Sequence, residues 1–254
     1  MTGISAFIVC KNEIAAMPRC LESVAWCDEV VVVDSGSSDG TLEFCRARGC
    51  RVFEKTWNGY VEQKAFALAQ CTEPWILNLD ADEEVSPELR DEIQSLLRRD
   101  AAFPLREDGF ELIRVVFYLG RWWRKGGWHP EWRLRLARRE RVTWHGEEPH
   151  EHARIPGLAG RLQGELRHFT YRDLTDHVRR LNTHSTQAAE ALHRKGRRAR
   201  TGDWILRPAA RFFRFYILRK GWCEGWPGFV AAGMEAFYAF LKYLKLAELS
   251  LTKR

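Results

Sequence analysis

The chain has 254 residues, 45% of them apolar, and this length and composition are typical of one globular domain with at most one appendage. Lys and Arg outnumber Asp and Glu by 40 to 34, and the net charge of +6 favours an anionic partner or surface. No run of about 18 residues is free of charge, so we expect no membrane-spanning helix.

The seven cysteines include no Cys-X-X-Cys pair, and Cys10 and Cys71 fall in apolar segments. This usage is typical of reduced cytosolic thiols that pack as small hydrophobic side chains. The spacing of His and Cys does not match a zinc site. We expect no signal peptide, because a strand-like run begins a few residues from the first Met.

The first hundred residues alternate short apolar runs with amphipathic segments. The runs predict strands at residues 4–10, 29–33, 51–54 and 74–79. Between them apolar side chains recur every three or four positions, which predicts helices at residues 14–24, 42–48, 59–71 and 86–99. This alternation indicates an α/β fold, with a mostly parallel sheet flanked by helices.

The pattern changes after residue 100. A polar helix is expected at residues 171–195, after shorter strands at residues 110–116, 132–137, 142–144 and 164–169. The last part is aromatic-rich and amphipathic, and is interrupted near Gly221 and Gly225. We therefore place a boundary between a main domain, residues 1–195, and a C-terminal amphipathic helical segment, residues 196–254.

Four carboxylates occur in five residues directly after a predicted strand, at residues 80–84. Open α/β sheets bind ligands at the carboxyl ends of their strands. Asp80 and Asp82 lie two apart, so in an extended segment they share a face, and such a pair suits a hard divalent cation. The alternative is an acidic start to the helix that begins near Pro87, with Ser86 as its N-cap.

Aromatic and basic side chains gather in residues 121–135. Trp128 is one of four Trp within eleven residues, and Arg and Lys stand between them. The functional interpretation is a rim that stacks on sugars and binds phosphate, and the alternative is core packing. Arg133 and Arg135 share one face of a strand, where they would meet a diphosphate or an anionic acceptor.

The C-terminal segment separates apolar from basic side chains. Between Leu206 and Lys220, aromatic and aliphatic residues alternate with Arg and Lys at helical spacing. Such a segment can lie in a bilayer interface with its cations toward anionic headgroups. The alternative is a helical pair that packs on the main domain.

Several short blocks together are similar to family-2 glycosyltransferases of the GT-A fold. They are Val9-Cys10-Lys11-Asn12-Glu13, Val32-Val33-Asp34-Ser35-Gly36-Ser37-Ser38-Asp39-Gly40-Thr41, Gln63-Lys64 and Leu79-Asp80-Ala81-Asp82-Glu83. Later blocks resemble bacterial lipopolysaccharide-core β-1,4-glucosyltransferases, namely Tyr118-Leu119-Gly120-Arg121-Trp122, Gly127-Trp128-His129-Pro130, Arg133-Leu134-Arg135-Leu136, Pro149-His150-Glu151 and His168-Phe169-Thr170-Tyr171. The resemblance covers almost the whole chain.

This resemblance implies a UDP-sugar donor and a divalent cation, Mg²⁺ or Mn²⁺. A cation held by Asp82, with Asp80 on the ribose or on a metal-bound water, would neutralise the leaving diphosphate. Asp34 would accept a base N–H, unless it only holds the turn that precedes the next helix. Lys64 would reach the nucleotide or its phosphate as a point charge. The residues expected to bind the donor are Val9, Asn12, Glu13, Asp34, Lys64, Asp80, Ala81, Asp82, Trp128, Arg133 and Arg135.

The resemblance also implies inverting transfer, which needs a general base to take the acceptor hydroxyl proton. We favour Glu151, because the Pro149-His150-Glu151 block matches the family pattern. Glu148 and His150 are alternatives, since three carboxylates crowd this part of the chain. The alternative for the acidic residues between positions 147 and 151 is that they pair with Arg133 and Arg135, or bind acceptor hydroxyls.

Together these features predict transfer of a hexose, glucose in the first instance, to a sugar of a lipid-linked lipopolysaccharide-core acceptor. The alternative acceptors are another membrane glycolipid or an exopolysaccharide precursor. The protein would be cytoplasmic and peripheral on the cytoplasmic face of the inner membrane, where the surface is anionic. A nucleic-acid-binding module is disfavoured, because the strand-end carboxylates would repel phosphates without a metal. A nucleotidyltransferase is disfavoured too, because Lys11-Asn12-Glu13 replaces the expected glycine-rich loop.

Overall fold

A computed structural model describes residues 2–146, 151–200 and 202–251. The chain forms two compact units, the first of Met1–Val115 and Glu131–His168, the second of Val116–Pro130 and Phe169–Arg254. The domain boundary expected between residues 195 and 196 falls inside the second unit, and stays a prediction. Each unit is described in turn.

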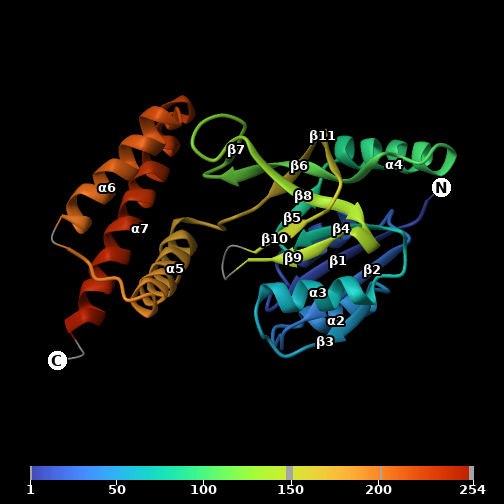
Figure 1. The fold of residues 1–254 in the computed structure, drawn as a ribbon, viewed down its shortest axis with the longest axis horizontal. Helices are drawn as coiled ribbons and strands as arrows, with labels where there is room; N and C mark the ends of the chain where they lie inside the picture. The colour runs from blue at the N-terminus through green and yellow to red at the C-terminus, as the bar shows by residue number, and fades with distance from the viewer. Residues whose placement is uncertain (1, 147–150, 201, 252–254) are drawn as a thin grey trace. The chain divides into compact units, whose positions relative to one another are not determined.

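Four parallel strands form one half of the sheet in the first unit, in the order β3-β2-β1-β4 (Figure 1). They are β1 (Ile4–Cys10), β2 (Glu29–Asp34), β3 (Arg51–Glu54) and β4 (Trp75–Asp80). β2 is a run of β-branched Val, which suits a strand buried on both faces. Val9 pairs with Val33 on one side and Asp80 on the other, so the carboxyl ends of three strands meet at one edge.

The other half of the sheet makes it mixed rather than parallel throughout. Beyond β4 the order is β8-β6-β11-β5, and the β4–β8, β8–β6 and β11–β5 pairs are antiparallel. The strands are β5 (Glu83–Val85), β6 (Glu107–Tyr118), β8 (Glu131–Arg138) and β11 (Leu158–His168). β9 (Thr143–His145) and β10 (His152–Arg154) form a separate ladder. Helices connect the parallel strands, whereas turns connect most strands of this half. Short turns permit antiparallel pairing.

Helices cover both faces of this sheet. They are α1 (Met17–Ser23), α2 (Thr41–Ala47), α3 (Tyr60–Gln70) and α4 (Pro87–Ala102). Alternate residues of β1 point to opposite sides, so Ile4 and Ile8 join the core under α1 and α4, whereas Phe7 joins that of α3. α4 begins as expected, because Ser86 Oγ accepts the Leu89 N–H at 3.1 Å.

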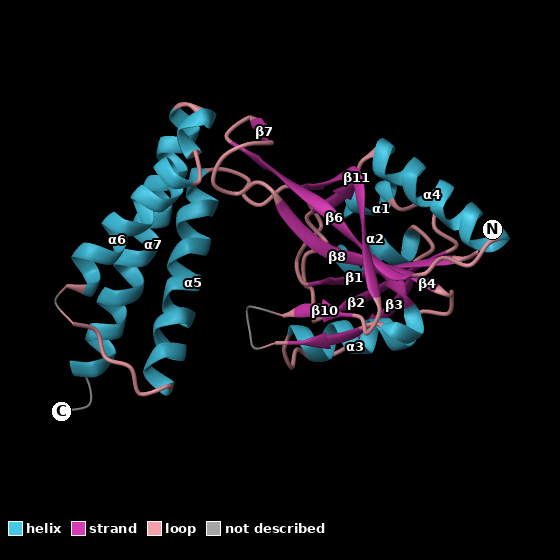
Figure 2. Ribbon diagram, turned by 45° about the horizontal axis from the view of Figure 1, so that its top comes forward, coloured by secondary structure: helices cyan, strands magenta, loops and turns pink. Residues whose placement is uncertain are grey.

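The second unit is mostly helical. Figure 2 shows α5 (Leu174–Arg194), α6 (Asp203–Phe213) and α7 (Trp226–Leu251) side by side. α6 continues into a π-helical turn, η2 (Arg214–Leu218), and a 3-10 turn, η3 (Gly221–Glu224), precedes α7. β6 enters this unit at its end, where it pairs with β7 (Arg121–Trp123). None of the described helices is both long and apolar enough to cross a membrane.

A buried histidine lies in an aromatic cluster of the second unit. His177 Nδ1 is 2.7 Å from the Tyr118 hydroxyl, and the Tyr171 ring stacks on the imidazole at 3.8 Å. Burial lowers the pKa of His177 from 6.5 to about 4, against the opposing effects of Glu235 and Asp176. The imidazole is therefore neutral at physiological pH, whereas it would be half protonated near pH 6.5 in the unfolded chain.

This shift predicts an acid-sensitive second unit. The unfolded chain binds more protons at His177 between pH 6.5 and pH 4, so stability is complete above that window and falls as the pH falls through it. The expected loss is about 2 kcal/mol between pH 7.5 and pH 5. Urea unfolding of wild type and His177→Gln at both pH values measures it. An equal pH dependence in the two proteins would refute the assignment.

Candidate active site

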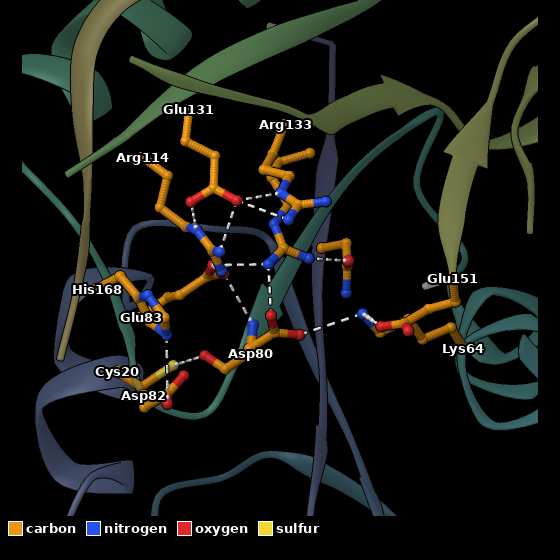
Figure 3. Close-up of polar contacts among 12 residues, drawn as sticks. Cys20, Lys64, Asp80, Asp82, Glu83, Arg114, Glu131, Arg133, Glu151 and His168 are labelled. Atoms are coloured by element: carbon orange, nitrogen blue, oxygen red, sulfur yellow. Dashed lines mark hydrogen bonds and ion pairs between the residues drawn. The ribbon is translucent and has the colours of Figure 1, made fainter. Parts of the chain in front are cut away.

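The edge where the parallel strands end gathers buried charges. Asp80 is the last residue of β4, and its carboxylate accepts hydrogen bonds from Arg135 and from Lys64 Nζ, the latter at 3.2 Å. Arg135 is 6% exposed and comes from β8, the antiparallel neighbour of β4. Its other terminal nitrogen donates to Asn78 Oδ1 at 2.7 Å, so β8 holds one guanidinium against two residues of β4. Asp80 and Lys64 lie together at this edge (Figure 3), and their expected contacts with the donor stay a prediction.

Glu83 extends this cluster into a network. It is fully buried and accepts from Arg135 at 2.6 Å, from Arg114 at 3.3 Å and from the Asp80 backbone N–H at 3.0 Å. Arg114 donates from two nitrogens to Glu131, at 2.8 and 2.9 Å, and Arg133 donates to the same carboxylate. A buried charge is stable only when paired, and each member here meets an opposite charge.

The network fixes the charge of Asp80. Burial alone would raise the pKa of this carboxyl group, but the charges of Arg135, Lys64 and Arg114 lower it well below the ordinary value. Burial alone would lower the pKa of Arg135, but the charges of Asp80 and Glu83 raise it. Asp80 therefore remains an anion at any physiological pH, with its two oxygens turned toward Arg135 and Lys64.

Lys64 connects Asp80 to the predicted general base. Its Nζ lies 3.2 Å from Glu151 Oε1 as well as from Asp80, and it rests against the ring of Trp144 at 4.9 Å. Lys64 is 3% exposed, so α3 brings a buried ammonium to the sheet edge. Glu151 immediately precedes β10 and joins the site, while Glu148 and His150 lie outside the described residues.

Asp82 points to a different partner from Asp80. Residues 81 and 82 form a turn between β4 and β5, so the expectation of one extended face for Asp80 and Asp82 is wrong. The carboxylate of Asp82 lies 3.4 Å from His168 Nε2. Antiparallel pairing explains this, because His168 at the end of β11 stands opposite Glu83, the residue after Asp82. Because of this turn, Asp80 pairs with Lys64 and Arg135, whereas Asp82 pairs with His168.

The donor atoms of Asp82 and His168 fit a hard or intermediate divalent cation. Among the described residues no group of three or more His, Cys, Asp and Glu is placed to hold a metal ion. Mg²⁺-type sites commonly take one or two protein carboxylates and complete the shell with substrate phosphates and water. A carboxylate beside an imidazole also suits Mn²⁺. The oxygens of Asp80 are already engaged by two cations, which fits an indirect role for that residue.

The residues expected to bind the nucleotide lie at the ends of β1 and β2, where the two following loops are hydrogen-bonded to each other. Asn12 Oδ1 accepts from the Ser38 N–H at 2.8 Å, and the Glu13 N–H donates to Thr41 Oγ1 at 3.0 Å. Asp34 is 1% exposed and accepts from the N–H groups of Gly36 and Ser37, at 2.9 and 2.7 Å. Asp34 therefore holds the turn in this structure, and its contact with a nucleotide stays a prediction.

Several residues of the site were not expected from the sequence. The sequence places Glu83 only in an acidic stretch that has two interpretations, and it gives no role to Arg114 or His168. One signal did exist, because Arg114 interrupts an apolar strand and a charge there needs a partner. Trp128 belongs to the second unit, where its ring packs on Trp123 at 4.6 Å, and its expected contact with the donor stays a prediction.

A mixed α/β sheet with ionised side chains gathered where its parallel strands end is typical of an α/β protein that binds its ligand at this edge. The chain belongs to glycosyl transferase family 2, whose family model matches residues 5–163. It is 33% identical to lipopolysaccharide core biosynthesis glycosyltransferase LpsC of Rhizobium meliloti, over 96% of this chain and 91% of that protein. An uncharacterized glycosyltransferase of Rickettsia typhi is 31% identical over 100% of this chain and 90% of its own length.

A solved structure shares the fold along nearly the whole chain. The mannosyltransferase PcManGT from Pyrobaculum calidifontis, in complex with GDP-Man and Mn²⁺, superposes with a TM-score of 0.55 at 14% identity. The superposition covers 96% of this chain and 87% of that one. At this level of identity the likeness establishes the fold, and the expected GT-A architecture is confirmed.

Proposed function

We propose that the protein transfers a hexose, glucose in the first instance, from a UDP-sugar to a sugar of a lipid-linked lipopolysaccharide-core acceptor, with inversion at the anomeric carbon. The observation that carries the transfer chemistry is the pairing of Asp82 with His168 beside the charge network of Asp80. The proposed acceptor class rests on the near full-length similarity to the Rhizobium meliloti core glycosyltransferase.

The two aspartates divide the work at the donor. Asp82 and His168 would hold a divalent cation, which when bound supplies charge neutralisation to the leaving diphosphate. Asp80, fixed by Arg135 and Lys64, presents a constant negative charge beside that position and is suited to orient the ribose or a metal-bound water. Its geometry is set before the donor arrives, because its partners are buried.

Glu151 is proposed as the general base. Its carboxylate is 15% exposed on the side chain, which leaves it accessible to an acceptor hydroxyl. The Lys64 ammonium pairs with both Glu151 and Asp80, so it fixes the position of the proposed base relative to the Asp80 carboxylate. Glu151 would take the proton of the acceptor hydroxyl while the acceptor oxygen attacks the anomeric carbon. The UDP diphosphate would leave on the opposite side of that carbon.

The donor assignment is tested by a screen of UDP-, GDP- and ADP-hexoses. Release of the nucleoside diphosphate is followed with Mn²⁺, with Mg²⁺ and with excess chelator. We expect hydrolysis or transfer from UDP-glucose only when a divalent cation is present. If only GDP- or ADP-sugars were turned over, the assignment of a UDP-sugar donor would be wrong. Full turnover in excess chelator would exclude a requirement for a divalent cation.

Asp34→Ala is expected to weaken UDP binding more than it slows the chemical step. A contact with the base is made equally in the ground and transition states, so its loss raises KM and leaves kcat nearly unchanged. The variant also loses the turn contacts of Asp34, so circular dichroism must first show that it folds. Calorimetric titration with UDP gives the answer, and an unchanged affinity in a folded variant would contradict the assignment.

The second unit is proposed to sit on an anionic membrane surface at the cytoplasmic side of the inner membrane. Large apolar side chains stand exposed on it, with Leu206 at 69% and Leu218 at 66%, among the arginines of α6 and η2. Interfacial segments bury such side chains in the headgroup region while their cations meet anionic lipids.

Replacing Leu206 and Leu218 together by Gln should lower binding to anionic vesicles roughly tenfold or more, since each buried Leu contributes about 1.5–3 kcal/mol. The matched control is Phe103→Gln, which removes an apolar side chain that is 77% exposed in the first unit. Co-sedimentation with vesicles at several salt concentrations measures the effect. If the double variant binds as wild type does, or if wild type stays in the supernatant, this membrane surface is assigned wrongly.

A further inference from the structure

A hollow of about 420 Å³ lies within the second unit, lined by side chains of α6, η2 and α7. Its charge is one-sided. Five cations line it, Arg207, Arg211, Arg214, Arg219 and Lys242, against the single carboxylate of Glu235. None of these residues belongs to the sheet-edge site, and the transfer chemistry does not use them.

Local ion pairs neutralise only part of this charge. Arg211 pairs with Glu235 at 2.6 Å, and Arg207 pairs with Asp203 one turn earlier on α6, also at 2.6 Å. Arg214, Arg219 and Lys242 face no carboxylate within 4.0 Å among the residues that the structure describes. Arg214 and Arg219 are exposed to solvent, and Arg219 also donates to the Gly127 carbonyl oxygen at 3.1 Å, so these cations are solvated but remain accessible to an anion that enters the hollow.

Lys242 reports the strength of this positive field. Its Nζ lies over the rings of Tyr243 and Tyr238, at 4.7 and 5.6 Å. Burial lowers the pKa of Lys242, and repulsion from Arg211 and Arg207 lowers it further. An anion in the hollow would relieve both effects, because it would meet the ammonium and the guanidinium groups together.

The surroundings indicate what kind of anion fits. A second hollow of about 260 Å³ shares Arg207 and Tyr243 with the first and adds Arg197, Arg198 and Arg200. Guanidinium groups bind phosphate through paired N–H donors, so two adjoining arginine-lined hollows suit one or two phosphate groups. The exposed apolar side chains of α6, η2 and α7 would contact the hydrocarbon part of the same molecule.

We propose that the arginine-lined hollow between α6, η2 and α7 is a binding site for a phosphomonoester or diphosphate group of an anionic amphiphile. The idea that this amphiphile carries the acceptor sugar rests on the proposed function, but the binding itself does not. The site differs from a diffuse basic surface because its cations converge on one volume, and so it distinguishes a compact, doubly charged phosphate from a singly charged phosphodiester.

The full-length protein is titrated with vesicles of phosphatidic acid or phosphatidylglycerol in phosphatidylcholine, adjusted to equal surface potential. Wild type should bind phosphatidic acid roughly tenfold more tightly, as expected for added charge-assisted hydrogen bonds. Arg214→Gln and Lys242→Gln, alone and together, should remove this preference. Arg194→Gln, which removes an exposed arginine of α5 outside both hollows, should keep it.

In a second experiment, inorganic pyrophosphate is titrated into the full-length protein without vesicles, and its binding is measured by calorimetry. Binding of pyrophosphate that falls in Arg214→Gln or Lys242→Gln would show that the hollow accepts free phosphate; a vesicle preference without it would restrict the site to a lipid headgroup. Equal binding of the two lipids by wild type, together with no variant-sensitive pyrophosphate binding, would overturn the proposal. Neither arm needs a sugar donor, so this failure is distinguishable from a failure of the proposed transfer reaction.

Discussion

Asp82→Ala is expected to remove most transferase activity while leaving the fold intact. Asp82 lies in a turn after β4 and not in the hydrophobic core, so its loss costs little packing. The variant would leave His168 as the remaining protein ligand and so lose the cation that neutralises the diphosphate. We expect a loss of about 4 kcal/mol of transition-state stabilisation, or roughly 10³-fold in turnover.

The measurement is initial-rate release of UDP at saturating Mn²⁺, with circular dichroism as the check on folding. Asp91→Ala is the matched control, because it removes a carboxylate that is 66% exposed on α4 and should leave turnover unchanged. A folded Asp82→Ala variant with near-normal turnover would exclude Asp82 as a ligand. His168→Ala should weaken activity in the same direction if the two side chains share one ion.

Glu151→Gln should lower turnover by roughly 10²–10⁴-fold, the usual cost of losing a general base. The amide keeps the size of the side chain and a hydrogen-bond acceptor for Lys64, but cannot take a proton at neutral pH. UDP affinity should change little, because Lys64 retains Asp80 as a partner. The pattern expected is therefore a fall in kcat with nearly constant donor KM.

Single-turnover rates with wild type and Glu151→Gln measure this effect. Glu140→Gln is the control, since that side chain is 83% exposed and stands outside the network. Glu148→Gln and His150→Gln decide among the alternatives that the sequence leaves open. If one of these variants shows the loss and Glu151→Gln does not, the base has been placed on the wrong residue.

The parallel half of the sheet could be predicted because each of its strands is a local apolar run. Asp34 and Asp80 end β2 and β4, the two neighbours of β1, and the carboxyl ends of parallel strands share one edge of the sheet. The antiparallel half could not be derived in this way. The contact of His168 with Asp82 depends on the register between β5 and β11, which are separated by about seventy residues of chain.

The resemblance implies different roles for Asp80 and Asp82, but the turn that directs their carboxylates to different partners could not be predicted from the sequence. An extended segment and a tight turn are both compatible with Asp80-Ala81-Asp82, and only the pairing of β5 with β11 selects the turn. Glu83 could not be placed either, because its burial depends on Arg114 and Arg135 from two other strands. Long-range pairing, and not local preference, determines which carboxylate is structural and which is available to a ligand.

A divalent cation and a UDP-sugar are proposed to bind together at the end of β4 through Asp82. Titration of Mn²⁺ into wild type and Asp82→Ala, followed by electron paramagnetic resonance with and without UDP, tests it most directly. Wild type should bind one Mn²⁺ whose affinity rises when UDP is present, and Asp82→Ala should lose that site. UDP binding that is equally tight in chelator, or Mn²⁺ binding that is unchanged in Asp82→Ala, would contradict the account.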